Sequence, residues 1–290
     1  MLGKPSPPHP LITVIESTPQ APLTPAVPVL NVKFVSDLYT VSLKQGTECA
    51  LKYGRQPYDC QEGSLMFLAP GQAVMPVESA KELNPDMESW TLMFHPELLR
   101  GFPLAERMAS YSFFEYDSNE ALHLSTRERE LVTGIVRRMQ EEYEGSIDTH
   151  APELIVSNLE LLLNYCKRFY GRQFRTRTGA SKDAVVRFDV FLRNYFESDM
   201  PEQEGVPTVQ RCAREVGCSA SYLSDLLKEE TGRTAREQIH HAVVEKAKTL
   251  LLGSNTTVAE IAYALGFEYP QHFSTLFKRM TGVSPAAYRN

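Results

Sequence analysis

Residues 208–234 read TVQRCAREVGCSASYLSDLLKEETGRT, and residues 257–284 read TVAEIAYALGFEYPQHFSTLFKRMTGVS. The two segments are copies of one pattern, because Val209 corresponds to Val258 and Gly217 to Gly266, while the second copy holds one more residue in its turn. An internal repeat of this kind predicts that one structural unit occurs twice.

Each copy carries the sequence signals of two short helices joined by a sharp turn. Thr208 or Thr257 precedes an amphipathic run and is suited to cap the first helix. Gly217 or Gly266 then supplies the left-handed backbone conformation that ends a helix. A second helix-forming run follows and stops near Thr-Gly. The pattern predicts a helix-turn-helix unit, whose second helix enters the major groove of DNA.

The segment between the copies predicts a rigid spacer. Residues 235–252 contain neither Pro nor Gly, and Gly253 follows them. One stripe of this expected helix is apolar and comprises Ile239, Val243, Ala247 and Leu250. A helix of this length spans about 27 Å, which is roughly what is needed to present two recognition helices to successive major grooves about 34 Å apart.

The two expected recognition helices share one polar face. If Leu223, Leu226 and Leu227 face the core of the first unit, positions i, i+3, i+4 and i+7 lie opposite them. In the first unit these positions hold Ser221, Ser224, Asp225 and Lys228. In the second unit they hold Gln271, Ser274, Thr275 and Lys278. We expect both sets to contact DNA.

The chemistry of these side chains predicts different roles. Gln271 suits a bidentate contact to adenine, Thr275 suits a thymine methyl group, and Asp225 suits a cytosine amino group. Lys228 and Lys278 are better suited to phosphates, which position a protein on DNA without specifying sequence. Because phosphates repel a carboxylate, Asp225 has the alternative role of capping or of rejecting wrong sequences.

The repeat also resembles a known family. The run EKAKTLLL, residues 245–252, and the second copy with its extension PAAYR strongly resemble the C-terminal DNA-binding domain of the AraC/XylS family of bacterial transcription regulators. The resemblance begins near Asp183. It implies two helix-turn-helix units joined by a long helix, double-stranded DNA as the partner, and the same recognition positions as those derived above.

Length and composition are compatible with two ordinary domains, because the chain has 290 residues of which 42% are hydrophobic. No run of about 18 apolar residues predicts a membrane span, and the N-terminus lacks the pattern of a secretory signal, so we expect a cytoplasmic protein with no membrane partner. Scattered cysteines without a CxxC pair favour reduced thiols over a disulfide framework or a zinc finger. The net charge is −6, but basic and acidic residues nearly balance from Ala180 onward, so non-specific attraction to phosphates should be modest.

The first domain is expected over residues 1–170. Residues 1–29 are rich in proline and predict an extended arm, in which LITVI can pair at a sheet edge. Short β-like runs over about residues 30–99 predict an antiparallel barrel or sandwich. The segment 63–71 resembles the strand and turn of cupin barrels, a sensor domain that family members commonly carry. The expected fold class is therefore α+β, with a cupin-like barrel and a helical hairpin preceding an all-helical DNA-binding domain.

The barrel offers candidates for an effector site but none for catalysis, a metal or a cofactor. Tyr53, Tyr58, Phe67 and Trp90 are expected either to line a cavity for a small apolar effector or to fill the core. His95 stands alone at a strand end and is expected to cap a helix rather than bind a metal. The sequence has neither the His-rich motif of metal-binding cupins nor a recognisable arrangement around a nucleophile.

Residues 100–170 predict a pair of helices. Ser125 is expected to cap the first, with Glu128 three residues later. The second has a wide apolar stripe formed by Ile155, Leu159, Leu162, Leu163, Cys166 and Phe169. This stripe predicts either a homodimer contact or an internal helical pair. Residues 171–182 are polar and basic and predict a linker, which places the DNA-binding domain at residues 183–290.

The sequence favours an effector-responsive transcription regulator that acts as a homodimer, with RNA polymerase as a further candidate partner. Two alternatives remain open. A cupin-type enzyme fused to a DNA-binding domain would carry a tightly bound transition metal. A ligand-independent regulator acting through protein contacts would have a closed barrel filled by side chains.

Overall fold

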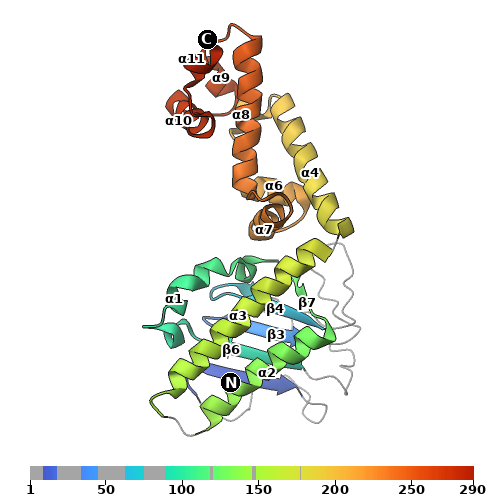
Figure 1. The fold of residues 1–290 in the computed structure, drawn as a ribbon, viewed down its shortest axis with the longest axis vertical. Coiled ribbons are helices and arrows are strands. Elements are labelled where there is room, and N and C mark those ends of the chain that lie inside the picture. Colours follow the sequence, from blue (N-terminus) through green and yellow to red (C-terminus); the bar gives the residue numbers. More distant parts are fainter. Residues whose placement is uncertain are drawn as a thin grey trace. The chain divides into compact units, whose positions relative to one another are not determined.

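The computed structural model describes residues 9–17, 34–44, 63–74, 89–117, 120–145, 148–176 and 178–290. Its contacts divide the chain into two compact units, residues 1–173 and 174–290. Figure 1 labels their helices and strands. Among the described helices, none combines the length and the apolar content that crossing a membrane requires.

The N-terminal unit is built on a five-stranded antiparallel sheet with the order β1-β6-β3-β4-β7. Its strands are β1 (Ile12–Ser17), β3 (Tyr39–Lys44), β4 (Ser64–Leu68), β6 (Ser89–Phe94) and β7 (Leu122–His123). A separate pair joins β2 (Phe34–Val35) to β5 (Ala73–Val74). The edge pairing expected for LITVI is present, because β1 lies at the edge beside β6. The sheet thus includes one strand that precedes residues 30–99 in the sequence, β1, and one that follows them, β7.

One face of this sheet is covered by α2 (Thr126–Glu144) and α3 (Ala151–Thr176) (Figure 1). Val41 lies opposite Phe67 on one neighbouring strand and Leu92 on the other, and all three side chains are buried. Trp90 Nε1 donates a hydrogen bond to Thr133 Oγ1 of α2 at 3.0 Å. Alternate strand residues therefore form the core, as period-two patterning requires.

Short helical turns lie between β6 and β7 in the sequence. They are η1 (Pro96–Leu99), α1 (Leu104–Arg107), η2 (Met108–Ser110) and η3 (Ser112–Glu115). His95 Nδ1 accepts a hydrogen bond from the backbone N–H of Glu97 at 3.1 Å, which confirms the capping role expected for this histidine. Ser125 and Glu128 form the expected capping box at the start of α2.

The apolar stripe of α3 is an internal contact. Every member is at most 6% exposed, namely Ile155, Leu159, Leu162, Leu163, Cys166 and Phe169. The interpretation of this stripe as a surplus dimer contact is therefore wrong, and the alternative of internal packing holds. The physical reason is that the sheet offers a broad apolar face, which a single sequence stripe cannot reveal.

The predicted linker, residues 171–182, is largely helical. Helix α3 continues to Thr176, and α4 begins at Thr178. The side chain of Gln173 is buried, accepts a hydrogen bond from the backbone of His123 at 2.8 Å and donates one to the carbonyl of Ala121 at 3.2 Å. The polar composition of residues 171–182 suggested a solvated segment. The amide of Gln173 is instead buried, because backbone groups at β7 satisfy its hydrogen bonds.

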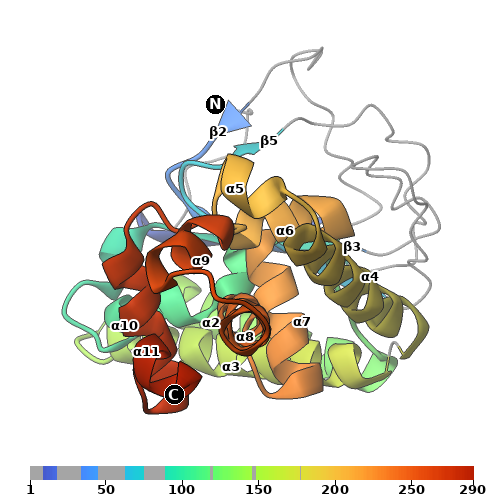
Figure 2. The same ribbon diagram turned by 90° about the horizontal axis from the view of Figure 1, so that it is seen from above.

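The C-terminal unit is entirely helical in its described residues. It comprises α4 (Thr178–Glu197), α5 (Met200–Glu204), α6 (Val209–Val216), α7 (Ala220–Thr231), α8 (Ala235–Gly253), α9 (Val258–Ala264), α10 (Pro270–Thr281) and α11 (Pro285–Arg289). The long helix α8 lies between the pairs α6–α7 and α9–α10 (Figures 1 and 2). Helix α4 packs on α6 and α8.

The turn after α9 meets the end of α5 at a backbone contact that only glycine permits. Gly266 has φ +88°, and a Cβ placed there would lie 2.5 Å from the carbonyl carbon of Gly205 and 2.7 Å from the carbonyl oxygen of Pro201. These neighbours are backbone atoms that cannot rotate away. Gly282 also has a positive φ, +83°, but a Cβ there would meet nothing within 4 Å.

We predict that Gly266→Ala destabilises the protein more than Gly282→Ala. Both changes place a Cβ in the left-handed region, which costs about 1–2 kcal/mol, but only the first adds a backbone clash. Urea unfolding followed by circular dichroism measures the difference. Equal losses in the two variants would show that the end of α5 and the turn after α9 move apart without cost at this contact.

Candidate nucleic-acid interface

The first helix pair is held at each turn by local capping. Thr208 Oγ1 accepts a hydrogen bond from the backbone N–H of Arg211 at 3.2 Å, which caps α6. Gly217 ends α6 with φ +81°, in the left-handed conformation. Ser219 Oγ then accepts from the backbone N–H of Tyr222 at 3.2 Å and caps α7. The turn expected from Thr208 and Gly217 is confirmed.

The second pair repeats this construction with different capping chemistry. Thr257 and Glu260 form a reciprocal capping box at the start of α9. Gly266 provides the left-handed turn, and Pro270 occupies the first position of α10. A proline is tolerated there because the missing N–H would have no partner within the helix. Gly282 ends α10 with φ +83°.

The buried faces of α7 and α10 are those that the sequence predicted. Leu223, Leu226 and Leu227 are fully buried in α7. Phe273 and Phe277 are fully buried in α10, whereas Leu276 is 8% exposed. These side chains occupy corresponding positions in the two repeats. Each helix therefore has a fixed rotation about its own axis.

The polar residues named from the sequence lie on the opposite faces. In α7, Lys228 is exposed, while Ser221, Ser224 and Asp225 have intermediate exposure. In α10, the exposed residues are Gln271, Thr275 and Lys278, and Ser274 is intermediate. Each helix thus brings its own set together on one side, at the spacing of successive turns.

Helix α8 and the C-terminal residues hold the second pair in place. The capping box of Thr234 and Glu237 starts α8, which ends at Gly253, as the sequence predicted. Arg289 donates from Nε to the carbonyl of Leu251 at 3.2 Å and from Nη2 to the carbonyl of Thr256 at 2.6 Å. The first bond satisfies a carbonyl in the last turn of α8, where a helix has no partners of its own, and the second binds the loop that leads to α9. The role of Arg289 was not predicted, because its partners lie far away in sequence.

The effector candidates are found in the core or outside the described residues. Phe67 is 6% exposed and Trp90 is 3% exposed, so both fill the core of the N-terminal unit. Tyr53 and Tyr58 lie outside the described residues. A cavity of about 20 Å³ beside Phe67 and Tyr170 has room for about one water. In the part of the chain that the structure describes, no three His, Cys, Asp or Glu side chains gather to hold a metal.

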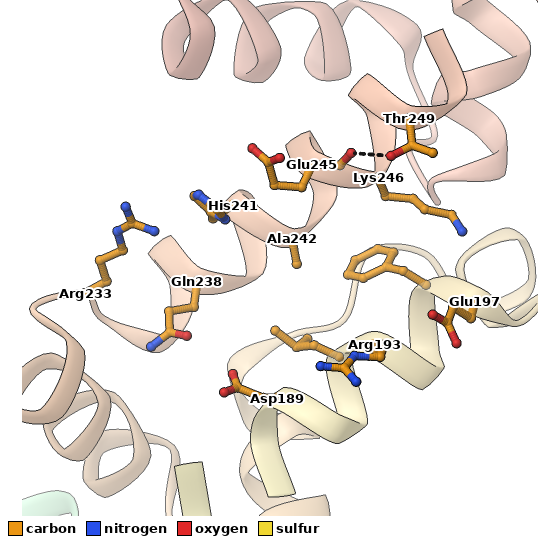
Figure 3. A pocket seen from close by; sticks show the side chains of 12 residues that line it. Asp189, Arg193, Glu197, Arg233, Gln238, His241, Ala242, Glu245, Lys246 and Thr249 are labelled. Atoms are coloured by element: carbon orange, nitrogen blue, oxygen red, sulfur yellow. Dashed lines mark hydrogen bonds between the residues drawn. The ribbon is translucent and has the colours of Figure 1, made fainter. Parts of the chain in front are cut away.

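A larger groove lies between α4 and α8. Figure 3 shows its lining side chains, and its volume is about 480 Å³. Asp189 and Arg193 come from α4, whereas His241 and Lys246 come from α8. The groove was not predicted, because these two helices are far apart in sequence. Charges of both signs line it, so it does not favour one class of ligand.

A cluster of basic residues was also missed. Arg236 and His240 lie one turn apart on α8, and Arg279 follows Lys278 on α10. Burial, followed by the charges of Arg236 and Arg279, lowers the pKa of His240, while Glu237 acts in the opposite direction. The Lys-Arg pair at positions 278 and 279 was the sequence signal that could have indicated this cluster. The sequence could not show that this pair lies near α8, because that proximity arises only in the folded chain.

Comparison with known proteins supports a regulatory role. Residues 212–290 match the family described as a helix-turn-helix domain. An uncharacterized HTH-type transcriptional regulator from the cgkA 5' region of Pseudoalteromonas carrageenovora is 34% identical over 128 residues, which cover 43% of this chain and 74% of that protein. The Escherichia coli K12 regulator YijO is 27% identical over 175 residues, covering 60% of this chain and 58% of that protein.

Further matches cover shorter parts of this chain. The xylose operon regulatory protein of Escherichia coli K12 is 36% identical over 75 residues, which are 26% of this chain and 19% of that protein. The solved C-terminal domain of the two-component response regulator yesN from Fusobacterium nucleatum is 30% identical, with a TM-score of 0.31, and covers 35% of this chain and 97% of that domain. The chain spans less than two thirds of YijO and of the xylose regulator.

The helix-turn-helix match over residues 212–290 includes α7 to α11 and the glycine turns described above, and the relative from Pseudoalteromonas is matched over 74% of its length. The sequence resemblance is thereby confirmed. The chain belongs to the AraC/XylS family of transcription regulators, which bind DNA through a helix-turn-helix domain.

Proposed function

We propose that the chain reads DNA through two helix-turn-helix units, α6–α7 and α9–α10. The observation that carries this proposal is the internal repeat: both pairs have a threonine cap, a left-handed glycine and a buried apolar set at matching positions. In each unit the second helix enters a major groove. Helix α8 spaces the units along one side of the duplex.

The exposed faces of α7 and α10 supply the readout. Gln271 recognises adenine, Thr275 contacts a thymine methyl group, and Asp225 accepts from cytosine or rejects other bases. Lys228 and Lys278 hold phosphates. The serine hydroxyls add short polar contacts from Ser221, Ser224 and Ser274. This division of roles follows from the donor and acceptor groups that each side chain offers.

The N-terminal unit serves as a cupin-like sensor in this proposal. An antiparallel sheet with one face covered by helices provides the scaffold, and Tyr53 and Tyr58 are the candidates for contacting a small apolar effector. The regulator acts in the cytoplasm and uses RNA polymerase as a partner in transcription. A tightly bound transition metal in the purified full chain would instead favour the cupin-type enzyme.

We also propose a homodimer that uses the outer face of α3. Leu154 is 46% exposed and Leu161 is 41% exposed, although both are large apolar residues. They lie seven residues apart, so they recur on the same side of the helix after two turns. Ser157, between them, is exposed and uncharged. A second copy of α3 would cover both leucines.

The DNA-binding unit should fold and bind without the sensor. We expect residues 178–290 alone to give a helical circular dichroism spectrum and to retain DNA binding, because both helix pairs, α4 and α8 lie within this range. Unfolding and a band-shift titration test the two properties separately. A fragment that is unfolded would contradict this boundary.

Two substitutions on α10 should distinguish a residue that recognises a base from one that contacts the DNA backbone. Gln271→Ala should cost roughly 1–3 kcal/mol on the selected operator and relax preference at one base pair. Lys278→Ala should weaken operator and mismatched sites alike and lower the salt slope by about 1. Titrations against operator point mutants at several salt concentrations decide between these effects. Altered base preference in Lys278→Ala, with none in Gln271→Ala, would refute the assignment.

The dimer proposal predicts different outcomes for two faces of α3. Leu154→Glu combined with Leu161→Glu should give a folded monomer, because both side chains are exposed in one chain. Leu159→Glu is the matched comparison and should unfold the unit, because its side chain is fully buried. Analytical sedimentation and thermal unfolding distinguish the results. A wild-type chain that is monomeric at micromolar concentration would end the proposal.

A further inference from the structure

The two recognition helices differ in charge although their architecture is the same. Helix α7 contains Lys228 together with Asp225, Glu229 and Glu230. Helix α10 contains Lys278 and Arg279 and has no acidic residue. In the repeat, Arg279 corresponds to Glu229, so one position carries opposite charges in the two units. Glu229 forms an ion pair with Arg175 at 2.8 Å, which neutralises part of the acidic charge of α7. DNA phosphates are therefore attracted more strongly to α10 than to α7.

Arg279 lies at the edge of the polar face of α10. It follows Thr275 by four residues, which places the two side chains about 40° apart around the helix axis. It is exposed, whereas Leu276 on the neighbouring side is buried. A long basic side chain at the edge of a recognition face is placed to reach the DNA backbone rather than the base edges.

Helix α8 brings further basic groups to this edge. Arg236 and His240 are one turn apart and share a side of α8, and α8 packs on α10. The charges of both Arg236 and Arg279 act on the His240 ring. Within residues 183–290, none of these three side chains has a hydrogen-bonding or ion-pair partner. The nearby carboxylate of Glu237 is engaged by Thr234.

We infer that Arg236, His240 and Arg279 form a phosphate-binding site beside α10, which makes the second unit the electrostatic anchor of the protein on DNA. The inference rests on the proposed two-unit reading of DNA. The positive charges of Arg236 and Arg279 exceed the single negative charge of the nearby Glu237, and a DNA phosphate relieves the repulsion that remains. The first unit then contributes sequence selection with little backbone attraction.

His240 gives this site a defined response to pH. Its pKa is lowered by burial and by the two arginines, with Glu237 opposing them, so the ring is largely neutral above pH 7 in the free protein. A bound phosphate favours the protonated ring, and binding therefore takes up a proton. DNA affinity should rise as the pH falls from 8 to 6.

The salt dependence of binding tests the site without a known operator. The full-length chain is titrated with a 30-base-pair duplex of random sequence at about 50 to 200 mM salt. Arg279→Gln and Arg236→Gln should each lower the magnitude of the slope of log affinity against log salt concentration by about 0.9. Each variant should therefore bind more weakly than the wild type at low salt, and the ratio of the two affinities should shrink about threefold between the lowest and the highest salt concentration. Lys246→Gln is the matched control, because this cation lies on the groove side of α8, and it should leave the slope unchanged.

The pH dependence tests His240 separately. His240→Gln should lose most of the affinity gain between pH 8 and pH 6, whereas His241→Gln and His272→Gln should keep it. Thermal unfolding confirms that the variants remain folded. If Arg279→Gln and Arg236→Gln behave like Lys246→Gln, or if His240→Gln keeps the full gain, the phosphate site is refuted. A wild-type chain that binds neither this duplex nor a selected operator would instead refute the proposed function.

Discussion

The candidate interface depends on the burial of matching apolar side chains in the two recognition helices. Leu223, Leu226 and Leu227 are inaccessible to solvent in α7, as are Phe273 and Phe277 in α10. Burial of such a side chain contributes about 1.5–3 kcal/mol, so a rotation that exposed two of them would cost several kcal/mol. The opposite face must then point outward. The polar residues proposed to read DNA are positioned by this constraint rather than by contacts of their own.

Helix caps and close packing hold the helices of the C-terminal unit in a fixed arrangement. Side-chain caps begin α6, α7, α8 and α9, and left-handed glycines turn the chain after α6 and α9. The contact between Gly205 and Gly266 brings the end of α5 against the turn that follows α9. Arg289 ties the end of the chain to carbonyls near the end of α8. The α6–α7 and α9–α10 units have similar architecture but differ in the charge of their recognition helices. A difference in how strongly the two units attract DNA would therefore come from charge and not from shape.

The N-terminal unit shows how the same sequence pattern can have two structural meanings. The stripe of α3 has the width and spacing of a helix-helix interface, yet it covers a sheet within its own chain. The outer face holds Leu154 and Leu161, which are partly exposed and less conspicuous in the sequence. Amphipathic periodicity identifies which side of a helix is buried. It does not identify the surface that buries it, because a sheet and a second helix satisfy the same apolar side chains.

Local signals in the sequence determined the helix pairs, their caps, the turns at Gly217 and Gly266, and the polar faces of α7 and α10, because each depends on residues within a few turns of each other. The sequence also predicted the antiparallel strands and the edge position of β1. Tertiary structure alone decided that α3 packs inside its own unit, that residues 171–176 are helical, and that Arg236, His240 and Arg279 gather at one edge of α10. These features join segments distant in sequence, and their energies come from surfaces and charges that meet only after the chain has folded.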